Sequence, residues 1–430
     1  MVVVAVYVDH GPGRQPLGAS RCHRPVADSR HWLADYRKPD RSGSGEHGGV
    51  RRKRTIILLS VGHGCVDVYQ GAVAALIPFF IAERAYTYAA ASGVVLAASL
   101  LSSVAQPLFG ALTDRWAMPW LLPLSTILGG LGIACSGITG SYPLTLAFVA
   151  VSGIGVAAYH PESARVARIA SGGSHAGMGW FSLGGNLGFA VAPILVAAVV
   201  ASGGLRLTPL LVLPALAGSV LCLPVLRALR PTAEAGSDIP RWIGTDNRAS
   251  FGRLSLAVVC RSVAFAGLST FLALYAPQRT DGGTSAGTAA LVVLYLGGAV
   301  GTVLGGNLAG RWDRVTVVRW SYLVSIAAVA GVVLVSGPAF YLFVALTSAG
   351  LYIPFSLQIT LGQDYLPNRV GTASGITLGL TVSVGGLVSP LIGGVADAIS
   401  LQVALAPLIL MPALSWLLFR TLPEPAVPRR

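Results

Sequence analysis

The chain has 430 residues, of which 53 % are hydrophobic and only 11 % are charged. An ordinary soluble domain carries about 25 % charged residues, so this composition excludes that class and indicates an integral membrane protein. The formal net charge of +13 could suggest a nucleic-acid partner. The basic residues lie between apolar segments, however, where they set the orientation of a membrane protein. We therefore expect contact with the lipid bilayer and none with nucleic acid.

The first 54 residues differ in composition from the remainder of the chain. The apolar run "VVVAVYV" near the start is too short to cross a bilayer, and no cleavage site follows it. The basic run "RRKR" (Arg51 to Arg54) precedes the first long apolar segment. We expect residues 1–54 to form a disordered, basic cytoplasmic tail, or to result from a start codon assigned too far upstream.

Twelve apolar segments follow, each long enough to cross a hydrocarbon core of about 30 Å. The predicted spans are 56–82, 89–112, 118–139, 142–163, 175–200, 207–227, 252–277, 286–309, 316–336, 338–363, 370–395 and 402–421. One longer polar connector separates the first six from the last six. The predicted domains are therefore an N-terminal six-helix bundle (55–229), a cytoplasmic linker (230–250), a C-terminal six-helix bundle (251–422) and a short C-terminal tail (423–430).

Basic residues are concentrated in every second connector. The opposite connectors hold little beyond Arg84, Arg206 and Arg279. Basic loops stay in the cytoplasm, so this asymmetry predicts a multi-pass protein of the plasma (inner) membrane with both termini in the cytoplasm.

The two sets of six spans repeat each other. Asp114 and Asp313 each stand in an Asp-Arg pair close to the end of a Gly-rich span, 199 positions apart. Pro193 and Pro390 lie 197 positions apart in spans five and eleven, and "AAYHP" recurs as "GLYIP" after 193 positions. Three pairs at nearly one offset predict two halves related by an axis along the membrane normal.

This arrangement resembles the major facilitator superfamily over about Thr55 to Leu422. The run "GALTDR" (Gly110 to Arg115) is similar to the Gly-x-Leu-x-Asp-Arg loop of that superfamily. The fifth span resembles the Gly- and Pro-rich motif of its drug–proton antiporters, with Ala192 where that motif has Gly. The resemblance implies an all-α membrane protein with twelve transmembrane helices in two six-helix halves, the major facilitator fold. It also implies a monomer.

Within the superfamily the chain resembles the fosmidomycin-resistance family of efflux transporters. The likeness rests on the blocks "HPESARVARIASGG" (His160 to Gly173), "GGNLG", "TDRWAMPWLLP" and "HGCVD". Two positions depart from that family, Val66 where we expect Asn and Ser182 where we expect Gln. Both departures bear on the substrate more than on the family. The resemblance implies export of a small, anionic antibiotic such as a phosphonate.

Span one carries the clearest candidate for a proton site. Asp67 lies twelve residues after Thr55, which places it about 18 Å into the membrane at about 1.5 Å per residue. An ionisable group at that depth costs about 2.5–3.5 kcal/mol. His63 and Gln70 share its helix face. We interpret Asp67 and His63 as proton-coupling residues and Gln70 as a cavity residue; the alternative is a structural polar cluster.

The cytoplasmic end of span four carries four polar residues within nine positions, His160, Glu162, Arg165 and Arg168. Pro161 favours a break there, with a second helix starting at it. In one interpretation Glu162 takes part in proton coupling, while His160 and Arg165 line the transport path. In the other, the two arginines pair with acids of other cytoplasmic loops and hold the inner gate closed. The sequence leaves both interpretations open.

The matched Asp-Arg pairs are expected to act in gating, because an Asp can bind a helix N-terminus across the two halves. The predicted gating residues are Asp114, Arg115, Arg168, Asp313 and Arg314. Asp364 and Arg369 flank the loop after span ten and are candidates for a latch.

Small residues and prolines in spans five and eleven allow close packing and bending. The predicted hinge and packing residues are Gly184, Gly185, Gly188, Pro193 and Pro390. Asn186 among them is a candidate for the substrate cavity. Arg261 is the cationic residue deepest in the second half, and we expect it to contact an anion.

These features favour a secondary transporter that exchanges a small molecule for protons by alternating access. The sequence holds no P-loop, so ATP drive is not expected, and we expect neither a cofactor nor a metal. The alternative within the class is a proton-coupled importer or exporter of a metabolite such as an organic acid. A membrane-embedded enzyme fits less well, because the longest internal connector has only about twenty residues and no cluster has metal-ligand spacing. We expect no enzymatic activity.

Overall fold

A computed structural model describes residues 45–116, 118–171, 175–229 and 245–425. The chain divides into a short unit, Met1–Gly49, and a compact unit, Val50–Arg430. Most of the predicted N-terminal tail, most of the predicted linker and the last five residues lie outside the described residues. The account below concerns the compact unit.

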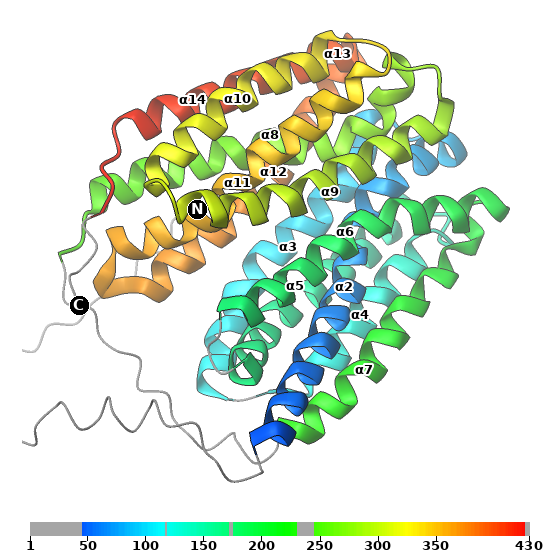
Figure 1. The fold of residues 1–430 in the computed structure, drawn as a ribbon. Helices are drawn as coiled ribbons and strands as arrows, with labels where there is room; N and C mark the ends of the chain where they lie inside the picture. Colours follow the sequence, from blue (N-terminus) through cyan, green and yellow to red (C-terminus); the bar gives the residue numbers. More distant parts are fainter. Residues whose placement is uncertain (1–44, 117, 172–174, 230–244, 426–430) are drawn as a thin grey trace, which may run out of the picture. The chain divides into compact units, whose positions relative to one another are not determined.

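All described elements of the compact unit are helices (Figure 1). The first half contains α2 (Gly45–Arg84), α3 (Tyr88–Arg115), α4 (Leu121–Ser136), α5 (Tyr142–Ser171), α6 (His175–Gly203), the 3-10 helix η1 (Leu205–Val212) and α7 (Leu213–Leu229). The second half contains α8 (Arg248–Arg279), α9 (Gly283–Ala309), α10 (Arg314–Leu334), α11 (Ala339–Tyr365), η2 (Pro367–Arg369), α12 (Val370–Ala398), α13 (Leu401–Leu405), η3 (Ala406–Ile409) and α14 (Leu410–Arg420).

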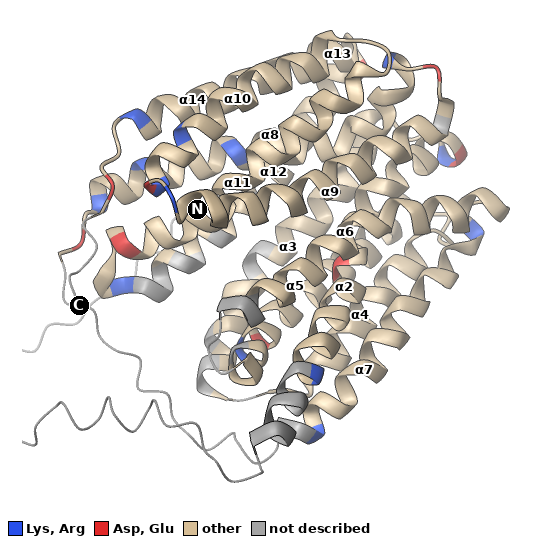
Figure 2. Cartoon of the chain, in the orientation of Figure 1, with Lys and Arg blue, Asp and Glu red and all other residues tan. Residues whose placement is uncertain are grey.

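Eleven spans among the described residues are long and apolar enough to cross a membrane, and α4 is a shorter apolar helix at the third predicted span. Figure 2 shows that charged residues gather near helix ends and leave long uncharged stretches between them. The predicted fold class, twelve transmembrane helices in two halves of six, is confirmed.

One local prediction is wrong. Helix α5 continues without a break through Pro161 to Ser171. Proline removes one main-chain hydrogen bond, but a helix packed among other membrane helices tolerates that loss. The residues on both sides of Pro161 are held in place, because Tyr159 and Glu162 are fully buried. The polar residues around Pro161 therefore share one continuous helix.

The two halves meet along two helix pairs, α3 with α12 and α6 with α9. At the start of α3, the two carboxylate oxygens of Asp397 accept hydrogen bonds from two main-chain groups of that helix. Tyr88 N donates at 2.7 Å and Ala89 N donates at 2.9 Å. A carboxylate at a helix N-terminus is favourable because free N–H groups and the helix dipole both attract it. Further along, a Cβ at Gly393 would lie 2.7 Å from Ser92 Oγ. The α3–α12 seam is therefore closed at this end.

The halves also repeat features that the sequence analysis did not find. The sixth span of each half includes a 3-10 helix that contains a proline, Pro209 in η1 and Pro407 in η3. The first helix of each half ends in an arginine, Arg84 or Arg279, that donates to main-chain carbonyls at the end of the third span. Each of these arginines also lies over an aromatic ring four residues earlier. The repeat thus extends to how each helix end is fixed.

Candidate functional site

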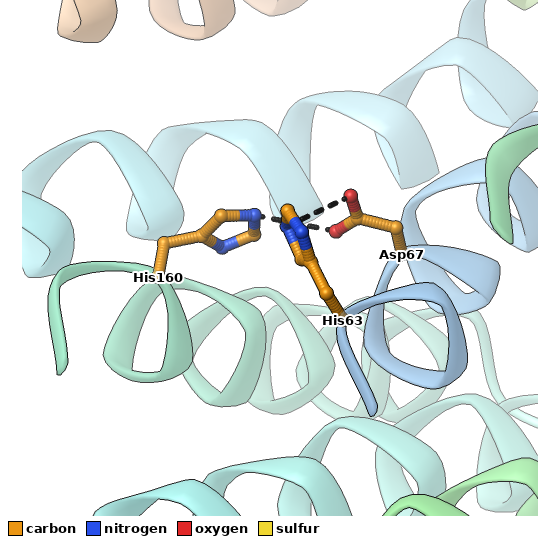
Figure 3. A group of neighbouring side chains, drawn as sticks. All are labelled: His63, Asp67 and His160. Carbon is orange, nitrogen blue, oxygen red and sulfur yellow. Dashed lines mark ion pairs between the residues drawn. The ribbon is translucent and has the colours of Figure 1, made fainter. Parts of the chain in front are cut away.

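Three titratable side chains meet inside the first half (Figure 3). His63 and Asp67 lie one turn apart on α2, with His63 Nε2 3.3 Å from Asp67 Oδ2. His160 reaches them from α5, with its Nε2 3.2 Å from Asp67 Oδ1. Asp67 is 4 % exposed and His63 is 7 % exposed. The carboxylate therefore lies between two imidazoles and away from water, and we call these three residues the His-Asp-His cluster.

Main-chain carbonyls fix the orientation of both imidazoles. His63 Nδ1 lies 2.9 Å from the carbonyl oxygen of Phe181, and His160 Nδ1 lies 2.8 Å from that of Val156. A carbonyl oxygen can only accept, so each Nδ1 carries the hydrogen. In the neutral form each Nε2 then presents a lone pair toward Asp67.

The contacts between Asp67 and the two imidazoles depend on where protons are bound. His63 Nε2 and Asp67 Oδ1 are buried and make no hydrogen bond among the described residues. Two lone pairs facing a buried carboxylate are unfavourable, because unpaired polar groups in the interior cost free energy. A proton on either imidazole or on the carboxyl group converts one of these contacts into a hydrogen bond. The geometry is suited to binding and releasing protons.

Aromatic rings and a glycine form the walls around the cluster. Phe181 stacks on His63 with ring centroids 4.2 Å apart and an interplanar angle of 13°. Tyr159 lies on the other side, with its ring centroid 6.1 Å from that of His63. Gly185 of α6 leaves room for Asp67, since a Cβ there would lie 2.4 Å from Oδ2. The sequence analysis missed Phe181 and Tyr159, because an aromatic residue in an apolar span carries no distinguishing signal.

The ligand atoms of the cluster lie within 4.8 Å of one another. Two imidazoles and a carboxylate are also side chains that can bind a metal ion. The metal content of the purified protein is therefore a control in the experiments below.

Arg261 occupies the interior of the second half and is 2 % exposed. Its Nη1 donates to the Leu351 carbonyl at 3.1 Å and its Nη2 to Thr381 Oγ1 at 3.2 Å. Its Nε makes no hydrogen bond, and no carboxylate of the described residues lies within ion-pair distance. The guanidinium carbon lies 6.0 Å from the centroid of the Tyr352 ring and 5.2 Å from that of Phe355. A buried cation without a counter-ion favours an anion nearby.

The remaining polar residues of span four form a separate pair. Glu162 is fully buried, and its two oxygens accept hydrogen bonds from Nε and Nη2 of Arg165 three residues later. The structure thus separates Glu162 and Arg165 from His160, although all three are close in sequence. Gln70 and Asn186 are half-buried on α2 and α6 and make no hydrogen bond with the cluster.

The predicted gating residues of the second half, Asp313 and Arg314, contact residues of that same half among the described residues. Asp313 caps α10 by accepting from Thr316 N at 2.8 Å. Arg314 pairs with Asp364 at 2.7 Å and with Glu424 at 2.8 Å. Arg369 lies 3.8 Å from Asp246 instead of pairing with Asp364. The side chains of the other three, Asp114, Arg115 and Arg168, lie outside the described residues.

The predicted packing glycines lie where two helices touch. A Cβ at Gly184 would lie 2.0 Å from the Ser60 carbonyl oxygen, and one at Gly188 would lie 2.2 Å from the Gly64 carbonyl oxygen. Helices α2 and α6 are therefore in direct main-chain contact, as small residues allow. Pro193 and Pro390 lie inside α6 and α12, both of which continue past them.

Two halves of apolar helices, each with an ionisable residue buried in its interior, are typical of a membrane transporter. The sequence model of the Major Facilitator Superfamily matches residues 59–390. The chain belongs to the Major Facilitator Superfamily.

Two curated relatives match most of the chain. It is 28 % identical over 373 residues to the Fosmidomycin resistance protein of Escherichia coli (strain K12), covering 84 % of this chain and 90 % of the relative. It is 27 % identical over 375 residues to the uncharacterized MFS-type transporter YfnC of Bacillus subtilis (strain 168), covering 85 % and 91 %. The resemblance seen in the sequence motifs is confirmed.

Solved transporters share the fold at low sequence identity. A bacterial homolog of the human lysosomal transporter Spinster, in an inward-facing and occupied conformation, aligns with a TM-score of 0.70 at 17 % identity, over 88 % of this chain and 99 % of that one. The nucleoside transporter NupG aligns with a TM-score of 0.67 at 12 % identity, over 85 % and 99 %. At these identities the likeness concerns the fold alone.

Proposed function

We propose that the chain is a proton-coupled secondary transporter that exports a small anionic compound in exchange for protons. The observation that carries the proposal is the His-Asp-His cluster, whose two imidazoles present lone pairs to one buried carboxylate. Each of the two contacts becomes a hydrogen bond when a proton is bound, so the cluster is suited to taking up and releasing protons. In this proposal both termini lie in the cytoplasm and the protein acts as a monomer in the inner membrane.

Arg261 supplies the proposed contact with the substrate. It is a buried cation with an unused N–H group and no carboxylate partner among the described residues. A phosphonate or carboxylate would provide the missing charge and accept from Nε, because a guanidinium binds such groups through several N–H donors. The relative named for fosmidomycin resistance supports a phosphonate antibiotic as the first compound to test.

Residues outside these two sites have supporting roles in the proposal. Arg165 is engaged by buried Glu162, which favours a structural part in the inner gate over direct contact with substrate. Arg314, paired with two acids of its own half, stiffens the inner end of that half.

Transport in liposomes with an imposed pH gradient tests the proposal. Fosmidomycin, organic acids and a cationic dye are offered to the wild type, to Asp67→Asn and to Asp364→Asn. Asp364 also pairs with a cation, but it is exposed at the surface, so its variant is the matched control. We expect Asp67→Asn to lose gradient-driven transport and Asp364→Asn to retain it. Undiminished gradient-driven transport by a folded, metal-free Asp67→Asn protein would overturn the proposal.

Reversing the gradient in the same liposomes decides between exchange and co-transport. An exchanger moves its substrate against the direction of proton flow, whereas a proton-coupled importer moves both together. Accumulation of substrate on the side that protons enter would favour the importer.

A further inference from the structure

We infer that helix α6 positions the proton site and that Gly185 is a positioning residue for Asp67, with Phe181 as its partner for His63. This inference rests on the proposed function, because it assigns the residues that fix the geometry of the proton site. Glycines of span five were expected only to pack or bend the helix. The contacts of Gly185 give it a more specific role.

The space that Gly185 leaves is filled by the cluster itself. A Cβ built at this position would lie 2.4 Å from Asp67 Oδ2, 2.7 Å from His63 Cε1 and 2.9 Å from His63 Nε2. Contacts this short require a neighbour to move, and the neighbours here are the carboxylate and the imidazole of the proton site. Any side chain at position 185 would therefore change the contact between Asp67 and His63.

Moving α6 away from α2 to relieve such a collision would break the close packing of the two helices. One residue before Gly185 and three residues after it, Gly184 and Gly188 bring α6 into main-chain contact with α2. One turn before Gly185, Phe181 holds His63 twice, through ring stacking at 4.2 Å and through its carbonyl oxygen on Nδ1 at 2.9 Å. The wall formed by Phe181 and Gly185 therefore sets both the tautomer of His63 and the place of Asp67.

The same helix also contacts the other half. Phe189 of α6 lies against Tyr295 of α9, with ring centroids 5.3 Å apart, and α6 packs along α9. A relative movement of the halves thus acts on the helix that fixes the proton site. This places a mechanical link between the interface and the cluster on one element.

The groups that act electrically on His63 come from several elements. Asp67 lies on its own helix and His160 and Tyr159 lie on α5. Tyr352 of α11, which lies beside Arg261 of α8, is a further titratable group on which the charge of Asp67 acts. Gly185→Ala adds no charge to this set, so a changed titration would report geometry.

Histidine titration by NMR tests the inference without a substrate. The full-length chain, with seven histidines, is labelled with 15N-histidine in lipid nanodiscs, and the signals of His63 and His160 are assigned with the His63→Gln and His160→Gln variants. The compared variants are Gly185→Ala and Gly179→Ala. Gly179 lies on the same helix, and a Cβ there meets nothing within 4 Å, so it controls for the change in helix propensity.

We expect Gly185→Ala to move the titration midpoint of the cluster by on the order of one pH unit, a tenfold change in proton affinity, and Gly179→Ala to leave it in place. If both variants titrate like the wild type, the inference is overturned while the proposed function stands. If neither imidazole of the wild type titrates between pH 4 and pH 9, the proposed function fails.

Phe181→Leu keeps the inference testable if Gly185→Ala does not fold. It removes the ring stacked on His63 and keeps the main-chain carbonyl, so it should fold and shift the His63 midpoint by a smaller amount. A folded Phe181→Leu protein with the wild-type midpoint would count against α6 as the positioning helix.

Discussion

The first helices of the two halves carry opposite charges at equivalent positions. Asp67 of α2 and Arg261 of α8 lie 194 positions apart, within the range of the other repeated pairs. Each faces a tyrosine of the fourth span, Tyr159 near the His-Asp-His cluster and Tyr352 beside Arg261, which lie 193 positions apart. The same scaffold therefore holds a buried carboxylate between two imidazoles in one half and a buried guanidinium in the other.

The difference lies in how the two charges are compensated. Asp67 has one nitrogen of each of two imidazoles within 3.3 Å, and imidazole is a group that can carry or lose a charge. Arg261 has only neutral partners among the described residues, and arginine stays charged. In the proposed transport cycle the first half would change its charge, while the second half would keep a constant one. Two predictions test this contrast and two test contacts at helix ends, from the largest expected effect to the smallest.

Arg261→Gln should have the largest effect, because it removes the buried positive charge of the second half. Hydrogen bonds to a charged group contribute about 1.5–3 kcal/mol, so we expect the affinity for an anionic substrate to fall by about ten- to a hundredfold. Arg279→Gln is the matched control, because Arg279 lies on the same helix, donates to carbonyls and stacks on a tyrosine. Concentration-dependent transport measures both, and a cationic dye should show no such loss. Equal affinity in wild type and Arg261→Gln would remove Arg261 from the substrate site.

His160→Gln should alter the pH profile of transport more than His63→Gln. Both remove an imidazole, but His160 is the residue that joins Asp67 to a second helix. We expect about a tenfold loss of transport at the optimum pH for His160→Gln, which corresponds to about 1.4 kcal/mol. Transport rates between pH 5 and pH 9 provide the measurement. A larger loss in His63→Gln would reverse this ranking.

Asp397→Asn should weaken the closed α3–α12 seam. The variant keeps one acceptor and loses the charge that holds two N–H groups of α3. Glu83→Gln is the control, since Glu83 likewise accepts from a helix start, Leu205 N, but within one half. Spin labels on Gly140→Cys and Asp281→Cys, both at exposed positions, report the distance between the outer ends of the halves. We expect the population with separated ends to rise severalfold for Asp397→Asn only. Identical distance distributions in the two variants would contradict this.

Asp313→Ala should have the smallest effect, because Asp313 caps a helix at the surface. Loss of an N-cap lowers the free energy of unfolding by about 1 kcal/mol, which is measured as a lower midpoint of thermal unfolding. Asp313→Asn should keep most of this stability, because Asn is also a good N-cap. Slight burial raises the pKa of Asp313, but hydrogen bonds from Thr316 outweigh it, so the pKa lies below its usual value. The charge of the cap thus stabilises the fold above about pH 4, and this contribution is lost as the pH falls further. A wild-type midpoint in Asp313→Ala would exclude the capping role.

The fold could be predicted almost entirely from the sequence, because uninterrupted apolar segments and one repeat offset leave few alternatives. The pairing of His63 with Asp67 followed from their spacing on one helix. The contact with His160 could not be predicted, since it lies 93 positions from Asp67 and beside Glu162 and Arg165, which pair with each other. The directions of the side chains on α5 decide that His160 contacts Asp67 while Glu162 contacts Arg165. Spacing in the sequence does not reveal these directions.

Tyr352 and Thr381, which contact Arg261, were missed for a related reason. Both are common residues in an apolar span and depend on packing between helices to reach the guanidinium. For Tyr352 a signal existed in the repeat "AAYHP" and "GLYIP", which aligns it with Tyr159.

The contacts made by the arginine at the end of the first helix of each half should not depend on the pH of the medium. Arg84 and Arg279 each bind main-chain carbonyls on the side that we expect to face outward. A carbonyl oxygen does not take up a proton at any pH that a cell meets, and arginine does not release one. Acidification of the medium would therefore leave these hydrogen bonds intact. Each half should keep its shape under the proton gradient that drives the proposed transport.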